Sequence, residues 1–220
     1  GDGMINTIIQ NSIGEDIALG IIPIGKTNLF ANILGITDWR VGCRTLVKPQ
    51  STLVDLGTVD ERYFTSSIEI TPTQGVSYRF LRLFAKRATT KYCPIIMTIV
   101  SEETKLKLQT NVVSLLISTI PTTGRYILED ELANKELHIR IKSKPTLHHP
   151  TKKNTTIEEI SMFSGEKISI ESKNGCPIVI DAEPYGKTPV EIGIIPQAFR
   201  VIIPKKEWVE QETRGRMVKK

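Results

Sequence analysis

Hydrophobic positions in the first fifty residues alternate between helical and strand spacing. The run 3–11 predicts a helix with one apolar side, formed by Met4, Ile5, Ile8 and Ile9. Residues 16–23 are almost all apolar, which indicates a strand buried on both faces of a parallel sheet. Thr27 and Asp38 stand where two further short helices would begin. This alternation predicts that residues 1–50 form part of a doubly wound α/β lobe.

After residue 50 the pattern changes to short runs rich in β-branched residues, separated by turn residues. Such runs are typical of an antiparallel sandwich, and one helical stretch, residues 75–87, interrupts them. The predicted strands are residues 51–57, 63–71, 95–100, 111–117, 137–141, 167–172, 177–180, 190–195 and 199–203. We expect an α/β plus all-β fold: a partial doubly wound nucleotide lobe (1–50), an antiparallel β-sandwich domain (51–203), and a C-terminal segment (204–220) that packs back on the first lobe.

The composition narrows the function classes only slightly. The 220 residues are 40% hydrophobic and 24% charged, with a formal net charge of +5, which fits a globular protein with an anionic partner. The basic residues are scattered and lack interleaved aromatic side chains, which argues against nucleic-acid binding. Cys43, Cys93 and Cys176 lie far apart and match no zinc or disulfide spacing, so a reducing compartment such as the cytoplasm is favoured.

Two glycine turns are candidates for binding an anion. Gly1-Asp2-Gly3 leads directly into the first predicted helix, and Gly25 lies between the apolar strand and the next helix. Glycine lets backbone N–H groups approach a phosphate, and the positive end of the helix points to the same place. The second turn adds a charge, a hydroxyl and an amide from Lys26, Thr27 and Asn28. A plain strand–turn–helix joint capped by Thr27 is the alternative. Because such a turn normally follows a strand, we expect part of the lobe to precede Gly1.

Several motifs occur in the order known from one enzyme family. The second turn supplies Pro23, Gly25, Asn28, Phe30 and Ala31. Later come Val-Asp-Leu-Gly at 54–57 with Tyr63-Phe64, Ile-Asp-Ala-Glu-Pro at 180–184, and Thr-Pro-Val-Glu-Ile at 188–192. Together with Gly1-Asp2-Gly3 they resemble the catalytic domain of the diacylglycerol kinase family, which includes bacterial lipid kinases, sphingosine kinases and the mitochondrial acylglycerol kinase. The resemblance spans nearly the whole chain.

The resemblance implies an ATP-dependent lipid kinase that uses Mg²⁺ to transfer the γ-phosphoryl group of ATP to the hydroxyl of a diacylglycerol-like lipid. Such a reaction needs turns that hold phosphates and a carboxylate that accepts the hydroxyl proton. The implied nucleotide-binding positions are Gly1, Asp2, Gly3, Gly25, Lys26, Thr27 and Asn28. Glu183 resembles the catalytic carboxylate of the family, with Asp181 beside it as a second catalytic candidate. The alternative is a polar hairpin turn. No metal ligand is assigned.

The chain also departs from the family pattern. Met4 and Lys26 each replace a Thr, Leu29 replaces an Asp, and Ala182 replaces a Gly. The Gly-x-Asp that the family pattern places near residues 70–75 is absent. Asn134-Lys135 occupies the position of an Asp-Gly in the family, although three acidic residues lie nearby at 129–131. The runner-up interpretation is therefore a catalytically degenerate member that binds lipid or nucleotide. A kinase for another hydroxyl substrate, as in the related NAD kinases, is a third interpretation.

The predicted helix at 75–87 bears on partners and localisation. Phe80 and Phe84 form one stripe, and Arg79, Arg82, Lys86 and Arg87 surround it. Such a helix fits contact with an anionic membrane beside the lipid entrance, or a packed helix with a solvated basic face. We expect a cytoplasmic protein that associates peripherally with a membrane and meets a lipid substrate there. Which lipid is phosphorylated, and whether a homodimer forms, stays open.

Overall fold

The computed structural model describes residues 1–72, 92–121, 132–143 and 159–205. Three helices lie in the first fifty residues: α1 (Asp2–Ser12), α2 (Leu29–Ile33) and α3 (Trp39–Val47). The strands are β1 (Ala18–Leu19), β2 (Gln50–Val59), β3 (Arg62–Phe64), β4 (Ser67–Ile70), β5 (Cys93–Val100), β6 (Lys105–Ser118), β7 (Leu137–Ser143), β8 (Glu159–Gly165), β9 (Lys167–Glu171), β10 (Pro177–Ile180), β11 (Glu183–Lys187) and β12 (Val190–Ile203).

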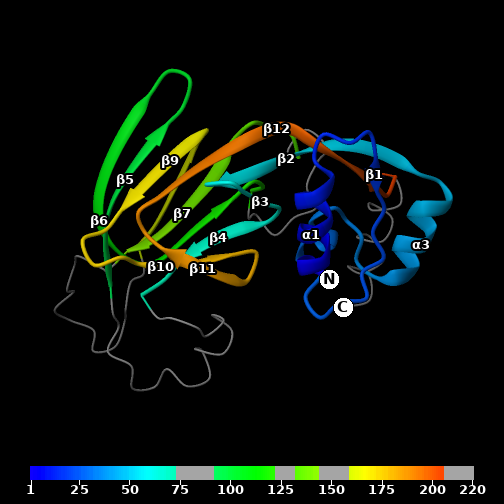
Figure 1. Ribbon diagram of the computed structural model, residues 1–220, viewed down its shortest axis with the longest axis horizontal. Helices are drawn as coiled ribbons and strands as arrows, with labels where there is room; N and C mark the ends of the chain where they lie inside the picture. Colours follow the sequence, from blue (N-terminus) through cyan, green and yellow to red (C-terminus); the bar gives the residue numbers. More distant parts are fainter. Residues whose placement is uncertain (73–91, 122–131, 144–158, 206–220) are drawn as a thin grey trace, which may run out of the picture.

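The described strands join into one mostly antiparallel sheet. Its main path runs β11-β10-β4-β6-β5-β9-β12-β2-β3, with β7 paired to β6 and β8, and β1 paired in parallel to β12. The sheet curls so that β8 returns towards β5, where the N–H of Glu166 donates to the carbonyl of Val100 at 2.8 Å. The architecture is thus a curled half-barrel with a few helices at one end (Figure 1).

Two hydrophobic cores form along this sheet. One fills the curled part and includes Phe64, Ile95 and Leu137, whereas the other lies under the helices and includes Ile9 and Phe30. The paired long strands β2 and β12 run from one core to the other, as Figure 1 shows. They therefore connect the helical end to the curled sheet.

The helices follow from local sequence signals. Asp38 caps α3, because its carboxylate accepts the N–H groups of Arg40 and Val41 at 2.8 and 3.0 Å. In α1 the apolar side buries Ile5 and Ile9, as the spacing predicts, while Met4 stays 70% exposed. The predicted helices at 3–11 and from Asp38 are confirmed within a residue or two of their ends.

Other expectations need correction. The apolar run 16–23 forms only the two-residue β1, and Ile17 and Ile22 are 44% and 43% exposed. β1 has β12 as its single described neighbour. The expected sandwich is one continuous curled sheet, and the runs 190–195 and 199–203 are one bulged strand, β12. The run 63–71 splits into β3 and β4, and β8 and β11 were not predicted.

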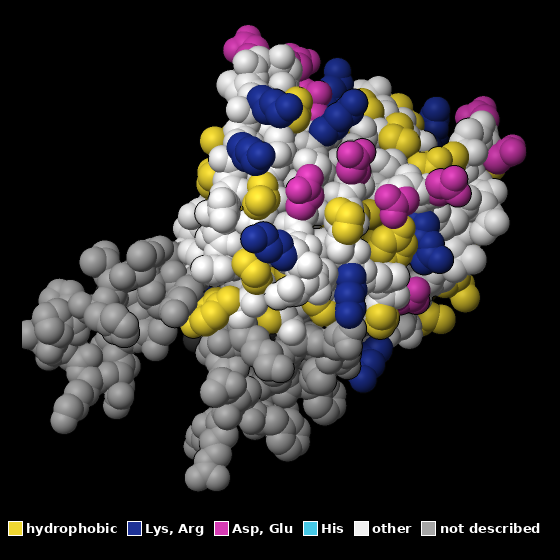
Figure 2. All heavy atoms as spheres, turned by 60° about the vertical axis from the view of Figure 1, so that its left-hand side comes forward, with side chains coloured by type: hydrophobic (Ala, Val, Ile, Leu, Met, Phe, Trp, Pro, Cys, Tyr) yellow, Lys and Arg dark blue, Asp and Glu magenta, His cyan; other side chains and the backbone are white. Residues whose placement is uncertain are grey.

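Several predictions fall on residues that the structure does not describe. These are the helix at 75–87, the acidic residues at 129–131 and most of the C-terminal segment. Within the described ranges, none of the helices has the length and apolar character needed to cross a bilayer. Figure 2 shows one face of the curled sheet, where Lys, Arg, Asp and Glu side chains are intermixed with apolar ones rather than gathered by sign.

Candidate functional site

The two glycine turns predicted from the sequence lie in direct contact. A Cβ added to Gly25 would fall 2.6 Å from the Cα of Gly1 and 2.7 Å from Oδ1 of Asn28. Real Cβ contacts are longer, so only glycine allows this approach. The start of α1 and the turn before α2 therefore form one compact unit.

Most donors expected to face a phosphate at the second turn bind protein atoms instead. The N–H of Gly25 donates to Oδ1 of Asn28 at 2.9 Å, and Nδ2 of Asn28 donates to the carbonyl of Gly25 at 2.6 Å. Asn28 adopts a left-handed conformation with φ of 50° and is the N-cap residue of α2, in place of the expected Thr27. Thr27 and Lys26 are exposed beside this closed turn.

The side chain of Asp2 binds the backbone that follows the second turn. Its two carboxylate oxygens accept the N–H groups of Leu29 and Phe30, each at 3.0 Å. These are orphan donors at the start of α2, so Asp2 caps this helix from another element and complements its dipole. The N-terminus of α2 is thus already satisfied by a carboxylate.

The N-terminus of α1 has no such cap. Its N-cap residue is Gly1, which provides no side-chain hydrogen bond, and Gly1 and Gly3 are both exposed. An 11-residue helix carries partial positive charge at this end, where its first N–H groups can bind an anion. Of the two helix starts that meet here, α1 is the one that no side chain caps.

Glu183 lies beside this helix end. It begins β11, is exposed, and places Oε1 3.4 Å from the position of a Cβ on Gly3. A shallow pocket at this point is lined by Gly3, Asn6, Arg62, Tyr63, Ile180, Asp181, Glu183, Pro184 and Tyr185. The structure therefore brings together a helix N-terminus and a solvent-accessible carboxylate that are 180 residues apart in the chain.

Asp181 is buried and hydrogen-bonded throughout. Oδ1 accepts the N–H and hydroxyl of Ser66 and the N–H of Ser67, and Oδ2 accepts the N–H and hydroxyl of Thr65 and Nδ2 of Asn6. These six donors come from α1, from the link between β3 and β4, and from the first residue of β4. A carboxylate offers about four lone-pair sites, so Asp181 holds three segments together and has no acceptor capacity left for a substrate.

A further group at the pocket was not identified from the sequence. The hydroxyl of Tyr185 donates to Oδ2 of Asp60 at 2.5 Å, and the guanidinium of Arg62 lies 5.4 Å from the Tyr185 ring centroid. The hydrogen bond to Asp60 raises the pKa of Tyr185, with smaller contributions from burial and from the charge of Asp60. No local motif marks these three residues, because they meet only when the β2–β3 turn packs on β11.

Asp55, singled out in the sequence as part of a strand motif, is a second buried carboxylate. It accepts the N–H groups of Lys135 and Gln197, each at 2.7 Å, and both of these residues have positive φ. It therefore fixes the turn at Asn134-Lys135 and the bulge in β12. Among the described residues, no group of three or more His, Cys, Asp or Glu side chains is arranged to hold a metal ion.

Sequence comparison links this region to known kinases. Residues 1–59 match the family profile "Diacylglycerol kinase catalytic domain". A diacylglycerol kinase of Bacillus subtilis (strain 168) is 37% identical over 68 residues, which are 29% of this chain and only 22% of the length of that relative. The resemblance to the diacylglycerol kinase family is thereby confirmed.

Structural comparison extends the likeness to the fold. A Bacillus anthracis protein assigned as a diacylglycerol kinase superposes with a TM-score of 0.71 at 16% identity, covering 94% of this chain and 77% of that one. Yeast NADH kinase, solved with NADH, gives a TM-score of 0.53 at 9% identity over 97% of this chain and 62% of that one. The fold is therefore that of the diacylglycerol kinases and, more distantly, of the NAD kinases.

Proposed function

We propose that the protein is an ATP-dependent lipid kinase that phosphorylates the hydroxyl of a diacylglycerol-like lipid. The observation that carries the proposal is the approach of Glu183 to Gly3 at the uncapped N-terminus of α1. A phosphoryl group at this helix end and a lipid hydroxyl at Glu183 would be neighbours, which is the arrangement that phosphoryl transfer requires.

In the proposed reaction the lipid oxygen attacks the γ-phosphorus as the bond from phosphorus to the ADP oxygen breaks. Glu183 accepts the hydroxyl proton, and the N–H groups at the start of α1 stabilise charge on the transferred group. Asp181 is a positioning residue in this scheme, because its hydrogen bonds hold the β10–β11 turn from which Glu183 projects.

Magnesium would enter with the nucleotide. Mg²⁺ is commonly held by substrate phosphates and one or two carboxylates, and the described residues do not form a three-ligand site by themselves. Asp2 is committed to α2 through both of its oxygens. We therefore assign no described residue as a metal ligand and place no step on the metal.

A radiolabel assay with [γ-³²P]ATP, Mg²⁺ and either diacylglycerol, monoacylglycerol or sphingosine in vesicles tests the proposal. We expect one of these lipids to be phosphorylated and Glu183→Gln to reduce turnover by about 10²–10⁴-fold, the usual share of a general base. Glu171→Gln, which changes an exposed carboxylate on β9, is the matched control and should keep full activity. Failure of a folded, nucleotide-binding protein to phosphorylate any of the three lipids would refute the catalytic claim.

A second candidate is a family member that binds nucleotide or lipid without transferring phosphate. It is favoured by the closed second turn, in which Gly25 and Asn28 bind each other, and by Leu29 in place of the family Asp. In this case calorimetry would detect nucleotide binding that Glu183→Gln leaves unchanged, with no turnover of any lipid.

A further inference from the structure

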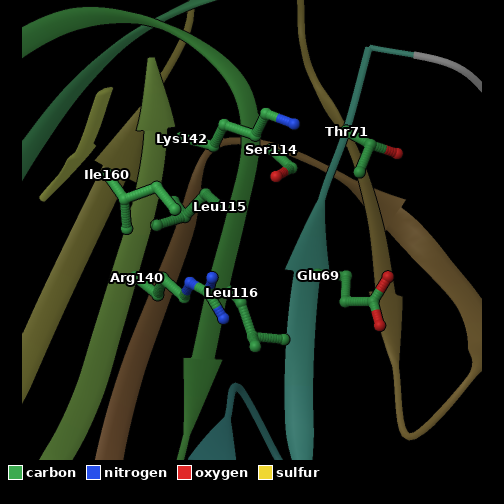
Figure 3. Close-up of a pocket in the computed structure, with 8 residues that line it drawn as sticks. All are labelled: Glu69, Thr71, Ser114, Leu115, Leu116, Arg140, Lys142 and Ile160. Atoms are coloured by element: carbon green, nitrogen blue, oxygen red, sulfur yellow. The ribbon is translucent and has the colours of Figure 1, made fainter. Parts of the chain in front are cut away.

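A second cavity lies in the curled sheet, on strands that do not carry the Gly3–Glu183 site. It has a volume of about 240 Å³ and is lined by Glu69, Thr71, Ser114, Leu115, Leu116, Arg140, Lys142 and Ile160 (Figure 3). The lining comes from β4, β6, β7 and β8, which are neighbours in the sheet. Neither the family motifs nor the proposed transfer reaction uses any of these residues.

The cavity has an aliphatic floor. Leu116 supplies it from β6, and Ile160 on β8 is 46% exposed at its edge, whereas Leu115 points to the other face and is buried in the core. Strand register explains the arrangement, because Ser114 pairs with Lys142 and Lys142 pairs with Ile160, so that these three side chains form one row across the sheet. The floor would favour a hydrocarbon chain over a polar ligand.

The same cavity carries two basic side chains. Arg140 pairs with Leu116 in the neighbouring row, and Figure 3 shows the Arg140 and Lys142 side chains reaching over β6. Among the described residues, no ion pair is recorded for Arg140. A guanidinium beside apolar surface is well suited to a carboxylate or phosphate, which it can bind through two parallel hydrogen bonds.

Glu69 adds one acidic side chain to the lining of the cavity. Its half-buried position raises the pKa of its carboxyl group, so Glu69 accepts a proton more readily than an exposed glutamate. In Figure 3 its carboxylate points away from Arg140, towards the far side of β4. The cavity therefore combines an aliphatic floor with the guanidinium of Arg140, from which the Glu69 carboxylate is directed away.

The geometry points to a binding site for a single-chain amphiphile with an anionic head group, with the chain on Leu116 and Ile160 and the head at Arg140. The two aliphatic side chains of the floor, Leu116 and Ile160, offer a surface for one hydrocarbon chain. The site is independent of the proposed kinase activity, so either can fail without the other.

Calorimetric titration with C10 amphiphiles below their micellar concentrations tests the site. We expect decanoate and decyl phosphate to bind, and neutral decanol to bind at least about tenfold more weakly, because it lacks a charge-assisted contact. Whichever of the two anions binds more tightly identifies a carboxylate or a phosphate head. Equal affinity for decanol and the anions, or no binding of either anion, would overturn the inference.

Three variants locate the binding. Arg140→Gln should weaken both anions about tenfold and leave decanol unchanged, whereas Lys167→Gln, an exposed residue on β9 outside the cavity, should have no effect. Ser114→Phe fills the cavity and should abolish binding of all three compounds, with circular dichroism and thermal unfolding confirming the fold. Undiminished anion binding by a folded Ser114→Phe or Arg140→Gln protein would place the amphiphile elsewhere and refute the assignment.

Discussion

The side chain of Asn6 donates a hydrogen bond to Oδ2 of Asp181 at 2.9 Å, joining α1 to the β10–β11 turn. Five further hydrogen bonds reach the same carboxylate from residues 65–67. Through this one side chain, the helix that begins at Gly3 and the turn that carries Glu183 keep a fixed relation. The site geometry therefore depends on a residue that does not itself face a substrate.

Replacing Asp181 with Asn should destabilise the protein strongly. The amide keeps one acceptor oxygen and turns the other position into a donor that faces Thr65 and Asn6, leaving buried N–H and hydroxyl groups unpaired. Each unpaired buried group costs about 1–3 kcal/mol, so we expect the free energy of unfolding to fall by about 3 kcal/mol or more. Urea denaturation measures the change, with the exposed Glu103→Gln as the control. A loss below about 0.5 kcal/mol would contradict this role for Asp181.

Local sequence signals predicted the helices well because their causes are local. Asp38 caps α3 through N–H groups two and three residues away, and the spacing of Ile5 and Ile9 sets the buried side of α1. The bulge in β12 could not be predicted in this way, because the carboxylate that fixes Gln197 belongs to Asp55, 142 residues earlier.

The same distinction between local and distant contacts decides which features of the candidate site could be predicted. The proximity of Gly3 and Glu183 was implied by the family resemblance and not by any spacing in the chain, whereas the engagement of Asp2 with α2 was missed altogether. A carboxylate flanked by glycines looks the same in the sequence whether it faces a phosphate or caps a neighbouring helix. β11 was missed because Glu-Pro-Tyr-Gly-Lys lacks the β-branched residues that mark strands.

Two glycine substitutions should distinguish an effect on phosphoryl transfer from an effect on stability. Gly3→Ala places a methyl group 3.4 Å from Oε1 of Glu183 in open surroundings, and alanine favours a helix by about 1 kcal/mol. We expect unchanged or increased stability with reduced phosphoryl transfer. Gly25→Ala instead meets the Cα of Gly1 at 2.6 Å and should cost about 1–3 kcal/mol. Thermal unfolding and turnover of both variants test this, and equal losses of stability would contradict it.

Gly57 and Phe64 should prove strongly coupled. A Cβ on Gly57 would lie 1.9 Å from the ring of Phe64, its partner across β2 and β3, so Gly57→Ala overpacks a filled core and should cost about 1–3 kcal/mol or more. Phe64→Leu in the same protein removes the clash, so the double variant should lose less than the sum of the single losses. Gly186→Ala, which meets no atom within 4 Å, is the control and should change stability little. Strict additivity in denaturant unfolding would argue against the packing.

Tyr185 should titrate above the pKa of an ordinary tyrosine, about 10. The hydrogen bond to Asp60 is the main cause of the raised pKa, so Asp60→Ala should lower it towards that value, whereas Glu61→Ala removes only a minor charge effect and should change it little. The fold favours the neutral phenol, so this stabilisation is present below pH 10 and is lost as the pH rises through the folded pKa. Ultraviolet difference titration against Tyr185→Phe measures the shift, and an unshifted Tyr185 would disprove the hydrogen bond.

The cysteines should differ sharply in reactivity. Cys43 is exposed, whereas Cys93 and Cys176 are buried. Burial, followed by the hydrogen bond with Cys176, raises the pKa of the Cys93 thiol to about 12, so Cys93 stays protonated at pH 8. Because the thiolate is the reactive form, Ellman's reagent should label one thiol quickly in the native protein and all three after unfolding. Cys43→Ser should remove the fast phase entirely. Two rapidly labelled thiols in the native protein would contradict the burial of Cys93 and Cys176.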